Sequence, residues 1–180
     1  PYEAVKTNII GAFNVVTAAV AQKVKNVIAV STDKAVKPVN AMGMTKALQE
    51  KLILSDEITK DKTIFCCVRY GNVLGSRGSV IPLWDKRLEQ KKPLPITHPD
   101  MTRFMLTLSE AIDLVFYSLK NSKGGEIFVK KAPATKMVNL ARAYAELKTG
   151  KTNYPLEYIG IRAGEKIDEV LVSEEEMRHV

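Results

Sequence analysis

A hydroxyl, a carboxylate and an amine stand side by side at Thr32, Asp33 and Lys34, directly after the apolar run 26–31. In open α/β sheets, ligands bind beyond the carboxyl ends of the strands, so a reactive cluster is expected at this place. Side chains of these three types can supply a hydrogen-bond donor, a general acid and a general base. The alternative is an ordinary loop, in which Asp and Lys are common and Thr or Asp begins the next helix.

Lys46 lies one to two turns inside the next expected helix, on the face that it shares with Met42 and Gly43. A lysine at this place can reach back over the strand ends and hold a ribose or a substrate hydroxyl. The alternative is a solvent-facing helix lysine, which is how we interpret Lys51.

The next expected strand ends with residues 69–73, and several glycine and arginine residues lie at this end and directly after it. Glycines allow backbone amide groups to approach a ligand closely, and an arginine can bind a phosphate through two parallel hydrogen bonds. Arg77, Arg103 and Arg162 come from separate loops and could together clamp a pyrophosphate. Considered singly, each of them could also be a surface arginine.

Helical and strand patterns alternate in the first part of the chain: helix 2–24, strand 26–31, helix 41–59, strand 63–69. Shorter elements follow: a helix near 109–119, a strand at 126–129, a helix near 138–149 and a strand at 156–161. We therefore expect an α/β fold. Residues 1–78 form the C-terminal half of a Rossmann-like doubly wound parallel sheet, and residues 79–180 form mainly a smaller α+β substrate-binding lobe.

No glycine-rich turn joins a first strand to a first helix, although a dinucleotide pyrophosphate needs one. The chain begins inside a helix, and the glycine run 71–78 lacks the required spacing and is not expected to open directly into a helix. The first residue is Pro1, which suggests a fragment truncated at its amino end. We predict that the 180 residues do not bind NADP alone.

The composition is that of a globular protein, with 46% hydrophobic and 26% charged residues and a formal net charge of +7. It argues against disorder, and we find no apolar run that suggests a membrane span. The positive charge favours anionic partners. A nucleic-acid partner has little support, because the pairs 91–92 and 130–131 lack interleaved aromatic residues.

The two cysteines, Cys66 and Cys67, are neighbours on a predicted strand, so their side chains point to opposite faces and a disulfide is not expected. With only His98 and His179 as histidines, we expect no metal site. The chain is interpreted as reduced and cytoplasmic.

Six motifs occur in order along the chain: TNIIG (7–11), STDKA (31–35), NAMGMTK (40–46), RYGNVLGSRGSVIP (69–82), PDMTRF (99–104) and IRAGEK (161–166). Across essentially its whole length the sequence resembles the polysaccharide-biosynthesis, CapD-like branch of the extended short-chain dehydrogenase/reductases. Within that branch it is most similar to the inverting UDP-N-acetylglucosamine 4,6-dehydratases.

This resemblance implies a redox-neutral lyase that acts on a UDP-sugar with NADP, or with NAD as the alternative cofactor. In such enzymes the C4 hydroxyl is oxidised, the C5 proton is removed, water leaves from C6, and the hydride returns to C6. By resemblance, Thr32 bonds the sugar at O4, Asp33 protonates the departing C6 hydroxyl, and Lys34 takes the C5 proton. Lys46 binds the nicotinamide ribose and favours deprotonation at C4.

The remaining site residues are also carried over by resemblance. Those assigned to the cofactor are Asn8, Lys46, Tyr70, Gly71, Asn72 and Val73. Those assigned to the nucleotide-sugar are Asn72, Arg77, Ser79, Val80, Pro82, Thr97, Arg103, Arg162 and Glu165. The resemblance further implies a homo-oligomer when the protein is full length, and no membrane or nucleic-acid partner.

Two positions depart from the family pattern. Family members usually place a tyrosine four residues before the lysine, as the base for C4 oxidation, whereas this chain has Met42, as a capsule-synthesis subgroup also does. Lys46, Lys34 and a relayed water are the candidate bases, and Lys46 is placed first because of its position. Ala163 stands where proline is usual. A UDP-sugar 4-epimerase and a non-catalytic nucleotide-sugar-binding fragment are the alternative functions.

Overall fold

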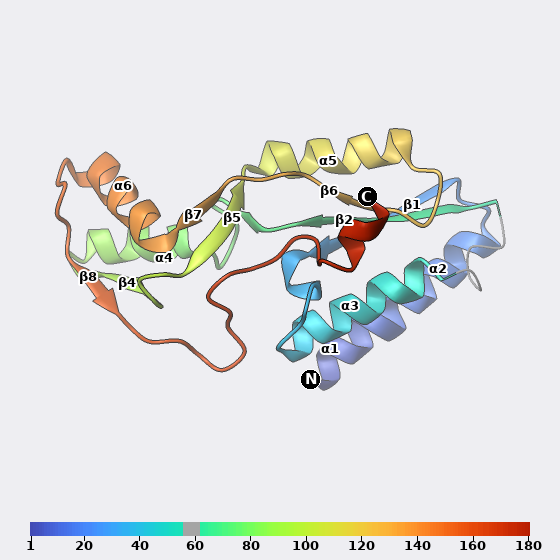
Figure 1. Cartoon of the computed structure of the whole chain (residues 1–180), viewed down its shortest axis with the longest axis horizontal. Helices are drawn as coiled ribbons and strands as arrows, with labels where there is room; N and C mark the ends of the chain where they lie inside the picture. Colours follow the sequence, from blue (N-terminus) through green and yellow to red (C-terminus); the bar gives the residue numbers. More distant parts are fainter. Residues whose placement is uncertain (56–61) are drawn as a thin grey trace. The chain divides into compact units, whose positions relative to one another are not determined.

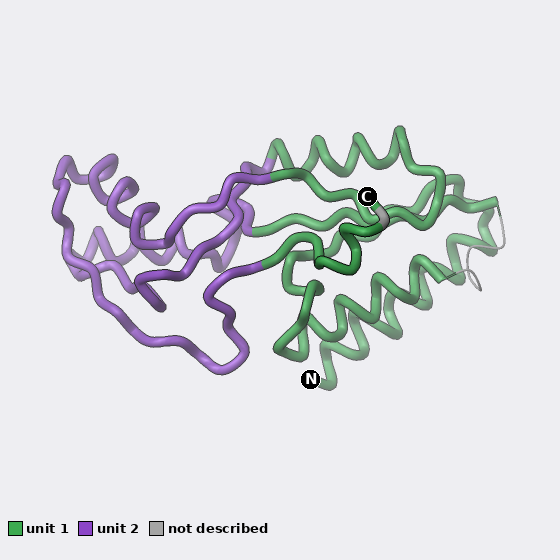
Figure 2. The backbone as a smooth tube through the Cα atoms, in the orientation of Figure 1, with its two compact units in different colours: residues 1–71, 109–131, 170–180 green, residues 72–108, 132–169 purple. Residues whose placement is uncertain are grey.

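The computed structural model describes residues 1–55 and 62–180. The chain forms two compact units, each built from separated stretches (Figure 2). Unit 1 contains residues 1–71, 109–131 and 170–180, and unit 2 contains residues 72–108 and 132–169. Each unit is described by itself below.

The sheet of unit 1 is parallel, with the strand order β1-β2-β6. β1 (Asn26–Thr32) pairs with β2 (Ile64–Tyr70), and β2 pairs with β6 (Ile127–Val129). Parallel neighbours require crossover connections, and α3 (Ala41–Ile53) supplies the one between β1 and β2. Figure 1 shows α3 on one face of this sheet and α5 (Leu108–Asn121) on the other. The predicted Rossmann-like α/β fold is confirmed.

The amino-terminal helix runs without a break through α1 (Tyr2–Val5), a π-helical turn η1 (Lys6–Ile10) and α2 (Gly11–Ala21). The predicted helix is thus confirmed, although it ends at Ala21 rather than at residue 24. One apolar face of α2, with Ala12, Val16 and Ala19, packs into a core with Phe65 of β2. By length and composition this helix is also apolar enough to cross a membrane, whereas the sequence was not expected to contain such a run.

Side-chain capping explains where α3 begins. Asn40 has extended backbone, and its side-chain oxygen accepts a hydrogen bond of 2.9 Å from the amide of Gly43. The helix ends at Ile53, and the predicted continuation to Thr59 lies partly outside the described residues.

Unit 2 has two small sheets and two helices. β3 (Asn72–Val73), β5 (Thr102–Leu106) and β7 (Ala134–Lys136) form one sheet, and β4 (Leu94–Ile96) and β8 (Leu156–Tyr158) form the other. α4 (Val80–Glu89) and α6 (Met137–Thr149) complete the unit. Its core is centred on Trp84, which is fully buried and donates a hydrogen bond to the carbonyl of Pro95.

The sequence prediction was wrong about the segment after residue 78. We expected no helix directly after the glycine run, but α4 begins at Val80, with Ser79 at its N-cap position. Pro82 does not break this helix, because a proline in the first turn lacks only an amide that would have no partner within the helix.

The compact units also divide the chain differently from the expected boundary at residue 78. The division falls after Gly71, and the later stretches 109–131 and 170–180 return to unit 1. The reason is topological, because β6 must lie beside β2 to extend the parallel sheet. The assignment of the two parts to cofactor and substrate stays a prediction.

Candidate active site

Three of the four predicted catalytic residues, Thr32, Asp33 and Lys34, meet where β1 ends in unit 1. Thr32 still has extended backbone, and the chain then turns through a 3-10 turn, η2 (Asp33–Ala35). The hydroxyl of Thr32 accepts a hydrogen bond from the Lys34 amide at 3.4 Å and donates one to Asp33 Oδ1 at 2.9 Å. A threonine cap therefore bends the chain so that the hydroxyl, the carboxylate and the amine lie together.

Asp33 and Lys34 form an ion pair between a buried and a partly accessible group. Lys34 Nζ lies 2.9 Å from Asp33 Oδ1, and the side chains are 28% and 0% exposed, respectively. Asp33 Oδ2 is buried and has no hydrogen-bond partner among the described residues. Buried polar atoms are nearly always hydrogen-bonded, so this oxygen is suited to accept a hydrogen bond from a ligand hydroxyl.

A close approach of α3 to η2 supports this pair. Gly43 packs so closely that a Cβ atom added to it would lie 2.3 Å from the carbonyl oxygen of Lys34. Only a residue without a side chain allows α3 to approach the turn in this way. Our sequence analysis did not assign Gly43 a supporting role, although a glycine in the first turn of a helix is a usable signal.

Lys46 reaches back over the strand end, as the helix spacing predicted. Its amino group donates hydrogen bonds to the carbonyl oxygen of Val30, at 2.7 Å, and to the side-chain oxygen of Gln49. Desolvation lowers the pKa of Lys46, and electrostatic interactions with Cys67, at high pH, and with Glu50 act against this effect. Four residues earlier on α3, Met42 is 41% exposed and offers a thioether, which cannot transfer a proton.

Two other predicted cofactor residues of unit 1 have clear structural surroundings. The amide of Asn8, in the π-helical turn, donates a hydrogen bond of 3.0 Å to the hydroxyl of Thr45 on α3. Tyr70 is half-buried at the end of β2, before Gly71, and burial raises the pKa of its phenol. Asn8 therefore joins two helices, and Tyr70 lies at the strand end where a ligand is expected.

A buried charge network stands behind the end of β2, and the sequence did not indicate it as part of the site. The guanidinium of Arg69 donates hydrogen bonds to both carboxylate oxygens of Glu50, to both of Glu176, and to the carbonyl of Leu171. Desolvation acts to lower the pKa of Arg69, but the hydrogen bonds with the two glutamates outweigh it and raise that pKa.

The second glutamate is fixed by its own segment. The Ser173 amide donates to the carboxylate of Glu176, and the Glu176 amide donates to the hydroxyl of Ser173. These reciprocal hydrogen bonds fix Glu176, the first residue of the 3-10 turn η3 (Glu176–His179). The last residues of the chain are thereby tied to β2, next to Tyr70.

A pocket in unit 2 collects most of the residues that were assigned to the nucleotide-sugar. The predicted residues that line it are Asn72, Val73, Ser79, Val80, Thr97, Arg103 and Glu165. Asn72 Oδ1 and Ser79 Oγ are buried without a hydrogen-bond partner among the described residues. Apolar side chains that the sequence did not single out, among them Met101, Met105 and Met137, also line the pocket. The pocket therefore combines an apolar wall with polar atoms that still lack partners.

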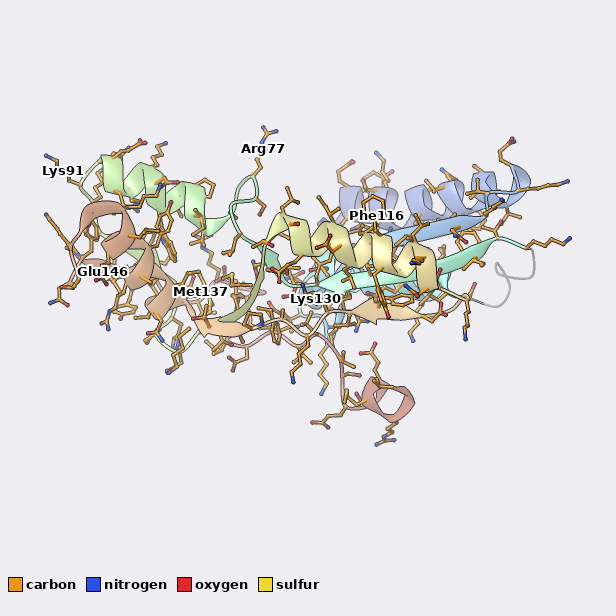
Figure 3. The ribbon with its side chains drawn as sticks, turned by 90° about the horizontal axis from the view of Figure 1, so that it is seen from above. Arg77, Lys91, Phe116, Lys130, Met137 and Glu146 are labelled. Carbon is orange, nitrogen blue, oxygen red and sulfur yellow. The ribbon has the colours of Figure 1, made fainter. Side chains whose placement is uncertain are left out.

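The three arginines proposed as a clamp have different surroundings. Arg103 lines the pocket, and its guanidinium donates to the carbonyl groups of Thr102, Lys166 and Ile167. Arg77 is exposed on the turn before α4 and points away from the ribbon (Figure 3). Arg162 is also exposed, and its amide donates to the Glu165 carboxylate.

Arg103 thus holds the segment 166–167 against β5. Arg77, Pro82 and Arg162 are not among the residues that line the pocket, so their binding roles stay predictions. In residues 1–55 and 62–180, no group of three or more His, Cys, Asp or Glu side chains could hold a metal ion.

Comparison with known proteins adds to this description. Residues 1–180 match the family described as polysaccharide biosynthesis protein. A UDP-glucose 4-epimerase of Rickettsia bellii is 50% identical over 98% of this chain, and one of Rickettsia felis is 49% identical over the same share. The chain covers 52% of each, so it spans about half the length of the curated relatives that it matches.

Solved structures give a similar result. The X-ray structure of Pen from Bacillus thuringiensis is 43% identical, with a TM-score of 0.91 over 97% of this chain and 56% of that chain. A dTDP-glucose 4,6-dehydratase from Bacillus anthracis, in complex with NAD, has a TM-score of 0.81 at 18% identity over 96% of this chain and 60% of that one. The second likeness concerns the fold alone.

Proposed function

Since the chain belongs to the polysaccharide biosynthesis protein family, we propose that the protein that carries it modifies the sugar ring of a UDP-sugar with a nicotinamide cofactor. The curated relatives are named as UDP-glucose 4-epimerases, and several structural neighbours are nucleotide-sugar enzymes in complex with NAD. Because the chain spans about half of these relatives, the activity is proposed for the whole protein.

The residues present fit the nicotinamide end of such a cofactor. Lys46 brings an amino group to the carboxyl end of β1, and Asp33 has a buried oxygen that lacks a partner among the described residues. When bound, the cofactor supplies reversible oxidation of a sugar hydroxyl. Lys46 would hold a ribose hydroxyl, and Tyr70 and Gly71 would lie at the neighbouring strand end. We propose NADP as the cofactor, with NAD as the alternative that the NAD complexes of structural neighbours support.

The site supports best a UDP-N-acetylglucosamine 4,6-dehydratase that inverts C5. The observation that carries this proposal is the contact of Lys34 Nζ with the buried Asp33 carboxylate. Removal of water across C5 and C6 needs a base for the C5 proton and an acid for the C6 hydroxyl. The proton of this ion pair would first pass from the Lys34 ammonium to the Asp33 carboxylate. The neutral amine of Lys34 would then take the C5 proton, the carboxylic acid of Asp33 would give its proton to the leaving hydroxyl, and Thr32 would hydrogen-bond O4.

A UDP-sugar 4-epimerase is the second candidate, and the names of the curated relatives support it more directly than they support the first. An epimerase acts at C4 and needs no base for C5. In both reactions C4 oxidation requires a proton acceptor that Met42 cannot provide, and we propose Lys46 for this role.

Incubation of the protein with UDP-N-acetylglucosamine and NADP in deuterated water tests the two candidates. A dehydratase gives a 4-keto-6-deoxy product with deuterium at C5, whereas an epimerase gives the C4 epimer without deuterium at C5. UDP-glucose serves as a second substrate. Calorimetric binding of a UDP-sugar without any turnover contradicts both candidates and favours a non-catalytic binding protein.

Replacement of the amine gives an independent test. Lys34→Ala is expected to abolish dehydration and to leave an epimerase largely active. Lys51→Ala is the matched control, because Lys51 is an exposed lysine on α3. The proposal also includes a cytoplasmic location. It further includes a homo-oligomeric whole protein, and size-exclusion chromatography with light scattering would check this oligomeric state.

A further inference from the structure

The amino group of Lys46 donates hydrogen bonds to two elements, and neither of the two acceptors is charged. In the part of the chain that the structure describes, its acceptors are the Val30 carbonyl oxygen on β1 and the Gln49 amide oxygen on α3. A half-buried ammonium group usually gains a carboxylate partner, because burial removes part of its hydration. Here two neutral oxygens take that place.

The acidic groups near Lys46 are already bound to other cations. Glu50, one turn further along α3, receives the bidentate hydrogen bonds of Arg69. Asp33, on η2, receives those of Lys34 and Thr32. Both carboxylates are thereby committed, so neither supplies the Lys46 amino group with a partner in contact.

The other titratable groups on elements packed against α3 do not supply one either. Cys67 faces Lys46 from β2, but burial raises the pKa of its thiol to about 12, so the thiol is neutral at neutral pH. On the amino-terminal helix, Lys6 is paired with Glu3. The segments β1 and α2 contain no titratable side chain.

We propose that Gln49 is a positioning residue for Lys46: its amide oxygen, with the Val30 carbonyl, holds the Lys46 amino group at the carboxyl end of β1 without giving it a countercharge. The inference rests on the proposed function, in which Lys46 accepts the proton of a sugar hydroxyl. An amine that is held by neutral acceptors releases its proton more easily than one in an ion pair. Gln49 would thus take part in making Lys46 usable as a base in a site that has methionine in place of tyrosine.

The test is an NMR titration of the lysine side chains of this chain, with the Lys46 signal identified by its loss in Lys46→Arg. Gln49→Glu places a carboxylate in the contact, and we expect the Lys46 midpoint to rise by about one to three pH units. Gln49→Met removes the acceptor, so the midpoint is expected to fall. Gln90→Glu, an exposed position in unit 2, is the matched control and should leave the midpoint unchanged.

A Lys46 midpoint that stays the same within experimental error in Gln49→Glu overturns the proposal, provided that the amide spectrum remains native. If that variant does not fold, Gln49→Met decides, and an unchanged or raised midpoint overturns the proposal. The titration does not depend on turnover. Shifted midpoints in a protein that converts no UDP-sugar would therefore contradict the proposed function while this inference stands.

Discussion

Replacement of Gly43 by alanine tests the close approach of α3 to the acid–amine pair. The new Cβ would lie 2.3 Å from the carbonyl oxygen of Lys34 and 3.1 Å from Cβ of Pro38. A comfortable carbon–oxygen contact is about 3.3 Å, so the turn or the helix must move by about 1 Å. The Lys34 oxygen belongs to the backbone, which cannot rotate away as a flexible side chain would.

The magnitude follows from two opposing effects. Overpacking of this kind costs about 1–3 kcal/mol, whereas alanine in place of glycine in a helix contributes about 0.5–1 kcal/mol of stability. We therefore expect Gly43→Ala to lower the free energy of unfolding by about 1–2 kcal/mol. Since a misplacement of about 1 Å can reduce a catalytic rate by about 100-fold, turnover should fall more steeply than stability.

Urea unfolding, together with the turnover assay described above, gives the measurement. The matched control is Gly11→Ala at the start of α2, where the added Cβ would lie 3.4 Å from the carbonyl oxygen of Lys6, an ordinary contact. This control should be as stable as the native protein or slightly more stable. A Gly43→Ala protein that equals the Gly11→Ala protein in both stability and turnover would refute the reasoning.

Three further predictions concern other side chains of the two units. The Arg69 hydrogen bonds lower the pKa of Glu176, so the stability that the Glu176 charge provides is present above the ordinary glutamate pKa of 4.5 and is lost as the pH falls below that value. In urea unfolding, the difference in stability between the native protein and Glu176→Gln should therefore shrink as the pH falls. A difference that does not depend on pH would contradict this prediction. Cys66 and Cys67 are fully buried, and burial raises the pKa of both thiols. A thiol reagent at pH 8 should therefore label them only after unfolding, and rapid labelling of the native protein would contradict this prediction. Trp84→Phe leaves a buried carbonyl without its donor and should lower the free energy of unfolding by about 1–3 kcal/mol in urea, and an unchanged value would show that the indole hydrogen bond contributes nothing.

The elements of unit 1 could be predicted because each carries its own local pattern. The helix that ends at Ala21 and the strands β1 and β2 have regular apolar spacing, and their predicted ends lie within three residues of the observed ones. In unit 2, α4 was not predicted, because no helix was expected directly after the glycine run; Pro82 lies in the first turn of α4, where a proline is tolerated. The strands β3 and β5 are short and pair across about 30 residues, so no local pattern reveals them.

The candidate site shows the same division between local and distant information. Thr32, Asp33 and Lys34 are consecutive, and their position after an apolar strand is enough to predict that they lie together. The partnership of Arg69 with Glu176 spans 107 residues, and nothing in the sequence near either residue indicates it. Distant contacts of this kind are set by the topology of the sheet rather than by spacing along the chain.

The discontinuity of unit 1 has a consequence for the order in which a ribosome delivers its parts. Arg69 follows Glu50 by 19 residues, so the hydrogen bonds between them can form early, whereas Glu176 follows Arg69 by 107 residues. All of unit 2 is therefore translated before the stretch 170–180 that returns to unit 1. A nascent chain that has left the ribosome only as far as residue 169 would carry a finished unit 2 and a unit 1 in which Arg69 still lacks its second carboxylate.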